Sequence, residues 1–215
     1  MKAYQTYIFD LDGTITDTMT VWLNILRESL IHFGITPPDD KTLAFYSHDW
    51  KQLKHIGFPE EKFDELAQFI YGLANKRLPE AEFHNGAYET LETLKNKGKR
   101  LAIYSSLDQA MFEPAMKYRN LYPLVDAAVA GTDITHRKPH PEGILKVLDT
   151  LDITSDLYNT VVYVGDKDTD IQAAHSAGVD SILYYPIEHS IIYDLKDLKK
   201  HNPTFIITEW SELLV

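Results

Sequence analysis

The sequence of 215 residues contains no cysteine. This absence excludes disulfide bonds, thiolate metal sites, iron–sulfur clusters and a cysteine nucleophile, and it agrees with a reducing compartment. Basic residues are also few, because 21 Lys and Arg stand against 32 Asp and Glu and give a net charge of −11. A broad nucleic-acid-binding face needs clustered Lys and Arg, so we expect no nucleic acid as a binding partner.

Long apolar runs are missing as well. No stretch of the sequence approaches the ~20 residues that a membrane-spanning helix needs, and we expect no membrane association. A strand-like run begins near Thr6 and leaves no room for a signal peptide before it. With 44% hydrophobic and 25% charged residues, the composition is that of a globular protein. We therefore expect a cytoplasmic protein, either a monomer or a homodimer.

Short apolar segments rich in β-branched residues alternate with segments of helical periodicity. Several of the apolar segments do not alternate with polar residues, which is typical of strands buried on both faces of a parallel sheet. The pattern predicts an α/β fold, with a Rossmann-like, mostly parallel sheet flanked by helices. The predicted strands are Thr6–Asp10, Arg100–Ser105, Leu124–Ala130, Thr160–Gly165, Ser181–Tyr185 and Phe205–Ile207, and helices are predicted at Gly86–Lys97, Pro141–Leu151 and Asp168–Ala177.

Residues 16–83 interrupt this alternation, because they contain only helical periodicity. Three amphipathic helices are predicted there, at Thr18–Phe33, Lys41–Ile56 and Glu60–Arg77,. We expect an all-helical subdomain inserted after the first strand, with residues 1–15 and 84–215 forming the α/β core. The segment His84–Gly86 is the expected returning hinge, since Gly86 tolerates the dihedral changes that hinge motion requires.

Acidic residues follow two of the predicted strands. Asp10 and Asp12 stand at the end of the first strand, and Asp166, Asp168 and Asp170 follow the strand Thr160–Gly165. Such acids can simply cap the helices that come next. Two clusters at the ends of separate parallel strands, with no thiol and no paired histidines nearby, instead favour a hard cation such as Mg²⁺ held by oxygen ligands.

Two further residues suit a phosphate ligand. Ser105 ends a predicted strand and offers a hydroxyl, and Lys138 lies between His136-Arg137 and Pro139-His140-Pro141 and offers a positive charge. Taken singly, Ser105 is an ordinary turn residue and Lys138 an ordinary surface charge.

The order of these pieces resembles the four motifs of the haloacid dehalogenase superfamily. They are Asp10-Leu11-Asp12-Gly13-Thr14, then Ser105, then Lys138-Pro139-His140-Pro141, then Gly165-Asp166-Lys167-Asp168-Thr169-Asp170. The chain is most similar to the phosphoglycolate-phosphatase-like and β-phosphoglucomutase-like branch, which carries a helical cap where this chain has its helical insert. Relatives often have Asn after the hydroxyl of the second motif, where this chain has Ser106.

The resemblance implies that Asp10 is the nucleophile, forming an aspartyl-phosphate. It implies that Asp12 is the general acid and base. Ser105 and Lys138 would hold the transferring phosphoryl group, and backbone N–H groups around Leu11 and Ser106 would complete the cradle. The implied Mg²⁺ ligands are Asp10, the backbone carbonyl of Asp12, and Asp166, with Asp170 as a further or outer ligand.

In this branch the cap recognises the leaving group, and the sequence offers four candidates there. These residues are Trp22, His48, Lys51 and Lys54. Lys51 and Lys54 lie at helical spacing together with His55, which is more typical of a solvated helix face than of a binding face. Trp22 is more typical of the core of the cap than of a surface that contacts substrate.

These observations favour a Mg²⁺-dependent phosphatase acting on a small phosphorylated metabolite. A phosphomutase of the β-phosphoglucomutase type remains an alternative, although the cap has no clear pair of basic anchors for a bisphosphate. A non-catalytic phosphate-metabolite sensor or interaction protein on the same scaffold is the alternative from another class. Dehalogenases lack an acid at the position of Asp12, and the Gly-x-Gly-x-x-Gly pattern of dinucleotide-binding folds does not follow the first strand,.

Overall fold

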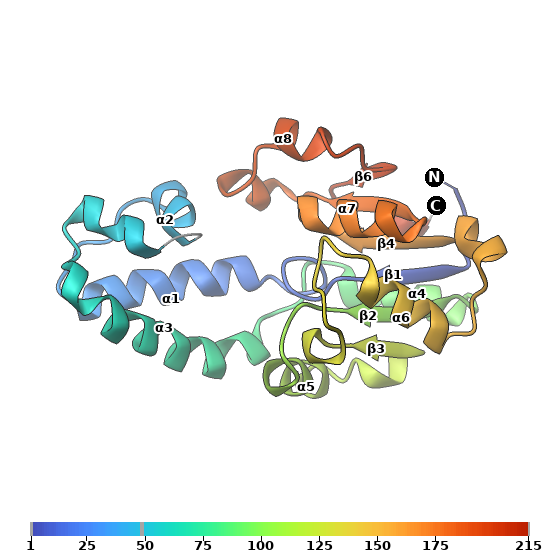
Figure 1. The fold of residues 1–215 in the computed structure, drawn as a ribbon, viewed down its shortest axis with the longest axis horizontal. Coiled ribbons are helices and arrows are strands. Elements are labelled where there is room, and N and C mark those ends of the chain that lie inside the picture. The colour runs from blue at the N-terminus through green and yellow to red at the C-terminus, as the bar shows by residue number, and fades with distance from the viewer. Residues whose placement is uncertain (1, 48–49, 215) are drawn as a thin grey trace.

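The computed structural model describes residues 2–47 and 50–214. Six parallel strands form one sheet in the order β3-β2-β1-β4-β5-β6. The strands are β1 (Thr6–Phe9), β2 (Arg100–Tyr104), β3 (Ala127–Val129), β4 (Val161–Gly165), β5 (Asp180–Tyr184) and β6 (Phe205–Ile207). The predicted α/β class with a parallel sheet is confirmed (Figure 1).

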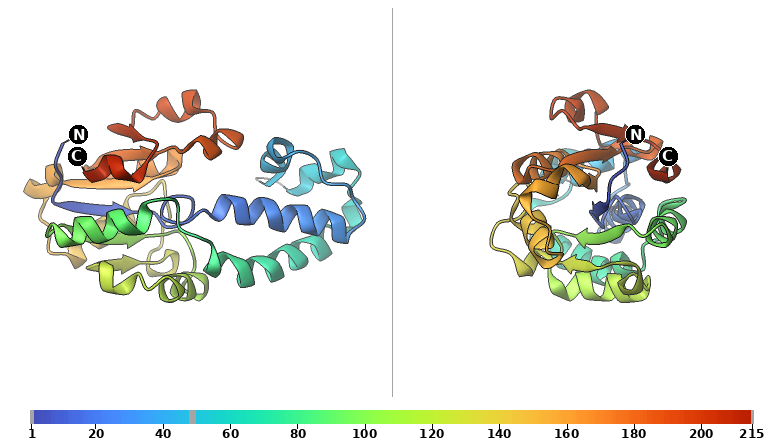
Figure 2. Two further views of the ribbon diagram at one scale, coloured as in Figure 1. Left: turned by 180° about the vertical axis from the view of Figure 1, so that it is seen from behind. Right: turned by 90° about the vertical axis from the view of Figure 1, so that its right-hand side faces the viewer.

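Helices cover both faces of the sheet, as the end-on view in Figure 2 shows. Helices α4 (Ala87–Asn96) and α5 (Gln109–Tyr118) pack on one face, together with the C-terminal 3₁₀ turn Trp210–Leu214. Helices α6 (Glu142–Thr150) and α7 (Asp168–Ala177) pack on the other face, and the short helix α8 (Leu195–Lys199) lies near the β6 edge.

The side chains of strand β1 point alternately into the apolar cores on the two faces of the sheet. Tyr7 and Phe9 point to the α4 and α5 side, whereas Ile8 points to the α6 and α7 side. Phe9 stacks on Trp210 with ring centroids 5.4 Å apart. Each such fully buried side chain contributes about 1.5–3 kcal/mol to folding, so the strand next to the site is held rigidly from both faces.

Residues 18–80 form the helical segment that projects from the carboxyl end of the sheet (Figure 1). It contains α1 (Thr18–His32), α2 (Asp40–Ser47) and α3 (Phe63–Arg77), with 3₁₀ turns at Trp50–Ile56 and Leu78–Glu80 among the described residues. The segment has its own apolar core, in which Leu26 and Leu30 of α1 lie with Leu66 and Ile70 of α3. Because it buries these side chains internally, it depends little on the sheet for its packing.

Two chain crossings join the helical segment to the sheet, and they pair with each other. Thr16 and Phe83 form an antiparallel bridge, and the N–H of His84 donates to the carbonyl of Ile15 at 3.0 Å. The buried Arg119 of the core donates to the carbonyls of Leu78 (3.1 Å) and Ala81 (2.8 Å). The junction therefore consists of two chain segments that are hydrogen-bonded to each other and to the core.

Some predicted elements differ from the structure. The predicted helix Lys41–Ile56 is wrong as one element, because α2 ends at Ser47 and Trp50–Ile56 is a 3₁₀ turn. Over seven residues, periods of 3.6 and 3.0 cannot be told apart by sequence pattern. The predicted strand Leu124–Ala130 is also too long, since Leu124 ends a 3₁₀ turn that contains Pro123 and β3 covers only Ala127–Val129.

Helix α5 of the core was not predicted, and neither was the short helix α8. Helix α5 contains Pro114, and an internal proline normally argues against a helix because it removes a backbone donor. Burial of Phe112 and Met116 against the sheet outweighs that cost. Within the described residues, none of the helices has the length and hydropathy that would let it cross a membrane.

Candidate active site

The chemistry-bearing residues follow three neighbouring strands. Asp10 comes directly after β1, Ser105 after β2 and Asp166 after β4, and β1 lies between β2 and β4 in the sheet. The carboxyl ends of parallel strands share one edge, where ligands bind in open α/β sheets. The sheet order thus brings together residues that are far apart in the sequence.

Lys138 provides the central charge of this edge. Its Nζ donates to Oδ1 of Asp10 at 2.7 Å, to Oδ1 of Asp170 at 2.8 Å and to the hydroxyl oxygen of Tyr163 at 3.0 Å. Only 6% of the Lys138 side chain is exposed, and its ammonium group lies 5.1 Å from the ring centroid of Tyr104. Three hydrogen bonds and burial therefore fix the position of the Lys138 ammonium group.

Burial and the neighbouring charges act in opposite directions on this group. Burial would lower the pKa of Lys138, but the carboxylates of Asp10 and Asp170 outweigh it and hold the pKa above its ordinary value,. For Asp10, burial raises the pKa, while Lys138 opposes that rise. Lys138 therefore remains an ammonium ion, and its charge limits the rise in the pKa of Asp10, which burial still raises to about 6.

Asp12 lies in a different environment from Asp10. Its Oδ2 accepts a hydrogen bond from Oγ of Ser105 at 3.3 Å. Burial, and then the charge of Asp10, raises the pKa of Asp12 to about 6. A carboxyl group in that range can donate a proton near neutral pH and take one back. Asp10 and Asp12 thus have similarly raised pKa values, of about 6, and differ in their neighbours, because Lys138 contacts Asp10 and Ser105 contacts Asp12.

Glycine and threonine bring Asp166 close to the loop after β1. Gly13 has φ +83°, and a Cβ at this position would lie 2.7 Å from Oδ2 of Asp166. Oγ1 of Thr14 donates to the other oxygen, Oδ1, at 3.2 Å. Only glycine allows both the left-handed backbone and this close approach, so the loop Asp12–Thr14 is shaped around the Asp166 carboxylate.

Asp10, Asp166 and Asp170 form a buried group of three carboxylates. One oxygen of each lies within 4.8 Å of the others. Three buried hard-oxygen donors fit a Mg²⁺ ion better than a softer metal. Both carboxylate oxygens of Asp170 already accept hydrogen bonds. Its Oδ1 accepts from Lys138, and its Oδ2 accepts from the backbone N–H groups of Asp166 and Lys167. These contacts favour an orienting role for Asp170 over direct ligation.

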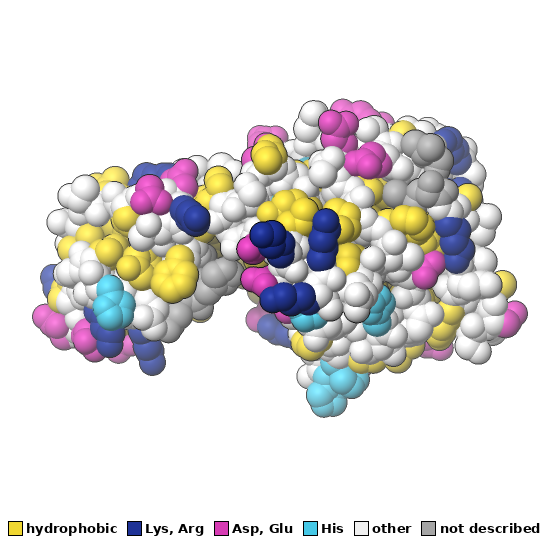
Figure 3. All heavy atoms as spheres, turned by 90° about the horizontal axis from the view of Figure 1, so that it is seen from above, with side chains coloured by type: hydrophobic (Ala, Val, Ile, Leu, Met, Phe, Trp, Pro, Cys, Tyr) yellow, Lys and Arg dark blue, Asp and Glu magenta, His cyan; other side chains and the backbone are white. Residues whose placement is uncertain are grey.

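Two cavities open at this edge of the sheet, on the side of the helical segment. A cavity of about 240 Å³ is lined by Asp10, Asp12, Ser105, Ser106 and Lys138. The second, of about 430 Å³, is lined by Asp12, Asp166 and residues of the helical segment. Seen from above, the surface narrows where the helical segment meets the sheet, and basic, acidic and apolar side chains gather along that junction (Figure 3).

Some of the residues that were predicted to contact the leaving group line these cavities, and others do not. Trp22 lines both cavities. His48 lies outside the described residues. Lys51 and Lys54 are exposed on the 3₁₀ turn Trp50–Ile56 and line neither cavity, and Lys54 forms an ion pair with Glu60 at 3.8 Å. The side chain of Leu11 is buried in the core, so only its backbone is available to a ligand.

Lys167 belongs to the site although sequence reasoning did not single it out. It is half-buried, it lines both cavities, and the charge of Asp166 holds its pKa above the ordinary value. Its position between Asp166 and Asp168 in the fourth motif is the feature of the sequence that could have identified it. Tyr163 was missed for another reason, because inside an apolar strand its hydroxyl cannot be distinguished from ordinary core.

Comparisons with known proteins identify the family and the fold that this chain shares. A family model described as haloacid dehalogenase-like hydrolase matches residues 7–184. A pyrophosphatase from Bacillus mycoides is 26% identical over 216 residues, which cover 97% of this chain and 94% of that protein. Among solved structures, a predicted phosphoglycolate phosphatase from Haemophilus somnus has a TM-score of 0.78 at 20% identity and covers 100% of this chain and 98% of its own. A candidate β-phosphoglucomutase from Thermotoga maritima has a TM-score of 0.76 at 21% identity, over 98% and 96% of the two chains.

The matched range runs from β1 to the end of β5 and contains the acids after β1 and β4, together with Ser105 and Lys138. The resemblance identified from the motifs is thereby confirmed, and with it the expected class of hydrolytic enzyme. The chain belongs to the haloacid dehalogenase-like hydrolase family.

Proposed function

We propose that this hydrolase is a Mg²⁺-dependent phosphatase that cleaves a small phosphorylated metabolite through a phosphoryl group carried on Asp10. The observation that carries the proposal is the shared cavity of about 240 Å³, where Asp10, Asp12, Ser105 and Lys138 meet. The cavity offers a nucleophile, a proton donor and a cation within one space. The similarity to a pyrophosphatase also supports phosphate-ester or phosphoanhydride hydrolysis.

Asp10 and Asp166 would hold the metal ion, with the backbone carbonyl of Asp12 as a third ligand and Asp170 orienting the group. The buried carboxylate cluster around Asp10 supports this assignment. The bound ion would supply positive charge to the phosphoryl oxygens and to Asp10.

In the first step, a carboxylate oxygen of Asp10 attacks phosphorus and the bond from phosphorus to the leaving oxygen breaks. Lys138 and Ser105 hold the phosphoryl oxygens, helped by backbone N–H groups around Leu11 and Ser106. Asp12 donates its proton to the leaving oxygen, which departs as an alcohol or as a protonated phosphate.

In the second step, Asp12 takes a proton from water while the water oxygen attacks phosphorus. The bond between phosphorus and the Asp10 oxygen breaks, which releases inorganic phosphate and restores both carboxyl groups. In the free enzyme the hydroxyl of Ser105 donates to Asp12 at 3.3 Å. Because a hydroxyl has one proton to donate, Ser105 would exchange this hydrogen bond for one to the phosphoryl group, which would leave Asp12 free for both proton transfers.

We further propose that residues 16–83 act as a cap that recognises the leaving group, hinged at Thr16 and at His84–Gly86. Trp22 of the helical segment lines both cavities beside Asp12, which supports its role in contacting the leaving group. Lys167 stands at the same boundary and would favour a leaving group with a negative charge of its own. Pyrophosphate and phosphoglycolate are substrates of that kind.

A phosphomutase is the second candidate, and the cavity lining argues against it. Within the described residues, the helical segment contributes Thr18, Met19, Trp22, Tyr71 and Leu78 to the two cavities, and no Lys or Arg. A sugar bisphosphate needs a cationic anchor for its second phosphate while water is kept out. Lys167 is the only additional cation lining the cavities in the described part of the chain, and it belongs to the core.

The test is phosphate release from a substrate panel of phosphoglycolate, sugar phosphates, nucleotides and pyrophosphate, each with Mg²⁺. A phosphatase releases inorganic phosphate, whereas a mutase yields isomerised sugar phosphate without free phosphate. Binding of a phosphorylated compound with no conversion at all would instead identify a sensor and overturn the proposal.

A further inference from the structure

Two histidines flank Lys138 on the loop that carries it into the active site. They are His136 and His140, and the loop leads into helix α6, whose first residue is Glu142. The backbone N–H of His140 donates to the carbonyl of Arg137 at 3.0 Å. This turn accompanies a close approach of the two imidazole rings, whose centroids are 4.7 Å apart. Both rings are exposed, and neither lines the two cavities of the active site. The proposed phosphoryl transfer therefore makes no use of them.

The carboxylate of Glu142 lies beside both rings. Its Oε2 is 2.9 Å from Nδ1 of His136 and 3.9 Å from Nδ1 of His140. The backbone N–H groups of Thr135 and His136 donate to Oε1 and Oε2, at 2.7 and 2.9 Å. The hydrogen bond from Thr135 lowers the pKa of Glu142 to about 2, so the side chain is a carboxylate at neutral pH. The loop thus holds an ionised oxygen in place next to two imidazoles.

The spacing of these atoms suits one metal ion. One ligand atom from each of His136, His140 and Glu142 lies within 4.8 Å of the others. The ligand atoms of a tetrahedral Zn²⁺ ion, at bond lengths of about 2.0–2.2 Å, are about 3.3–3.6 Å apart. The two distances from Glu142 to the rings, 2.9 and 3.9 Å, lie on either side of that range. Small rotations of exposed side chains would therefore complete the geometry.

We propose that His136, His140 and Glu142 bind a divalent transition metal ion of the Zn²⁺ class. Two imidazoles and a carboxylate are ligands of such ions and leave a fourth position for water. Mg²⁺ instead prefers oxygen ligands alone. The ion accepts the lone pair of Nδ1 of His136, and the neutral ring then carries its proton on Nε2.

The cations beside this site are already paired with acids. Lys138 contacts two carboxylates of the active site, and Arg137 forms an ion pair with Asp108. Their repulsion of a divalent ion is reduced accordingly. Because His136 and His140 lie two residues before and after Lys138, an ion bound to both ties together the two sides of the loop that positions the Lys138 ammonium group.

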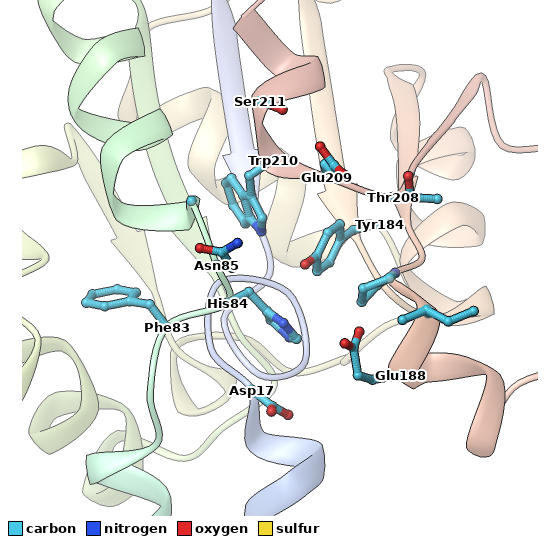
Figure 4. Close-up of a pocket in the computed structure, with 13 residues that line it drawn as sticks. Asp17, Phe83, His84, Asn85, Tyr184, Glu188, Thr208, Glu209, Trp210 and Ser211 are labelled. Carbon is cyan, nitrogen blue, oxygen red and sulfur yellow. The ribbon is translucent and has the colours of Figure 1, made fainter.

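A cavity of about 640 Å³ beside the two chain crossings also contains acids and a histidine. Figure 4 shows Asp17, His84 and Glu188 among its lining residues. Within the described residues, neither group of three side chains that could hold a metal ion includes a residue of this cavity. Nε2 of His84 is buried. The exposed histidines beside Lys138 are therefore the better site for a transition metal ion.

The experiment is calorimetric titration of the full-length protein with ZnCl₂ in an excess of Mg²⁺, which competes for sites made of oxygen ligands alone. One Zn²⁺ ion should bind to each chain. In H136Q/H140Q the affinity for Zn²⁺ should fall by about tenfold or more, because two of the three ligands are lost. The control H32Q/H55Q removes two other exposed histidines, both in the helical segment, and should bind Zn²⁺ as the wild type does.

Chemical modification of the wild type provides a second measurement, which does not depend on how a variant folds. Diethyl pyrocarbonate acylates accessible imidazole nitrogens, and mass spectrometry identifies the modified peptides. Zn²⁺ in an excess of Mg²⁺ should protect His136 and His140 from the reagent. It should leave His32 and His55 as reactive as before.

Three outcomes would overturn the proposal. They are no saturable binding of Zn²⁺, the same affinity for Zn²⁺ in the two double variants, and equal protection of all four histidines. The last two would mean that Zn²⁺ binds elsewhere or without selectivity. Each result is independent of the phosphatase proposal, because binding and acylation are measured without turnover.

Discussion

Nζ of Lys138 lies 2.7 Å from Oδ1 of Asp10, across 128 residues of sequence. Both side chains are 6% exposed, so neither charge can be satisfied by water alone. Removing Lys138 would leave the buried carboxylates of Asp10 and Asp170 without their common cation, whereas removing the charge of Asp10 leaves Lys138 paired with Asp170,. The proposed nucleophile and its neighbouring cation are thus linked in stability as well as in chemistry.

Replacing Asp10 by Asn should reduce turnover of p-nitrophenyl phosphate with Mg²⁺ by more than ~10³-fold, because the amide cannot attack phosphorus. The fold should persist, since Asn keeps the size of the side chain. The measurement is steady-state kinetics beside far-ultraviolet circular dichroism, with D156N as control. Retained activity in a folded D10N protein would refute the role of Asp10.

Replacing Lys138 by Met should lower the free energy of unfolding by about 3–5 kcal/mol, because Asp10 and Asp170 lose their common partner. Urea denaturation in EDTA measures this change. K41M, at an exposed position of helix α2, is the control and should change little. An unfolding free energy equal to that of the wild type would contradict the buried ion pairs.

Removing Mg²⁺ with EDTA should abolish phosphatase activity, and adding the ion back should restore it. Mg²⁺ at about 100 times its dissociation constant should stabilise the native protein by about 2.7 kcal/mol. The stabilisation should disappear in D166N and persist in D168N, since Asp168 lies outside the buried carboxylate cluster. Thermal unfolding with and without Mg²⁺ tests this, and an equal response in both variants would argue against Asp166 as a ligand.

The raised pKa of Asp12, about 6, predicts a pH dependence of stability. The native state holds this proton up to about pH 6, whereas the unfolded chain releases it near pH ~4. Relative to D12N, the wild type should therefore be most stable below pH ~4 and lose stability as the pH rises through about 6, remaining level above that.

The free energy of unfolding should fall by at most about 1.4 kcal/mol for each unit by which the pKa of Asp12 is raised. The fall is smaller to the extent that the Asp12 side chain is exposed to solvent. Urea denaturation of both proteins in EDTA measures the difference. Comparing the two proteins cancels the contributions of His84 and His189, whose lowered pKa values act in the opposite direction. A difference that does not vary between pH ~4 and ~7 would contradict the raised pKa.

Replacing Lys167 by Met should discriminate between substrates. If Lys167 meets a charged leaving group, kcat/KM for pyrophosphate or phosphoglycolate should fall by about tenfold more than kcat/KM for p-nitrophenyl phosphate. K167R should recover part of the loss. An equal fall for all three substrates would assign Lys167 to the transferred phosphoryl group instead.

Much of the fold was accessible to sequence reasoning because burial on both faces leaves an unmistakable pattern. The segments Arg100–Tyr104 and Val161–Gly165 are apolar at consecutive positions and form central strands. The edge strand β3 was harder to delimit, since Pro123 and Leu124 belong to a 3₁₀ turn that precedes the strand. Helix α5 was hidden by Pro114, whose cost is outweighed by tertiary packing.

Some residues of the candidate site can be recognised in the sequence, and others only in the structure. Asp10, Asp12 and Asp166 are recognised in the sequence because they follow apolar segments that form strands. Lys167 and Tyr163 are not, because their roles depend on which cavity or which ammonium group they face.

The sequence by itself determined the alternation of strands and helices, the family, and the acids that end strands β1 and β4. Local patterns are sufficient for these features, because periodicity and strand-end position are properties of neighbouring residues. The tertiary structure alone decided which charges meet. Sheet order places β1 between β2 and β4, and only the packed core holds Lys138 against Asp10, because a buried charge is stable only where the whole fold brings it a partner.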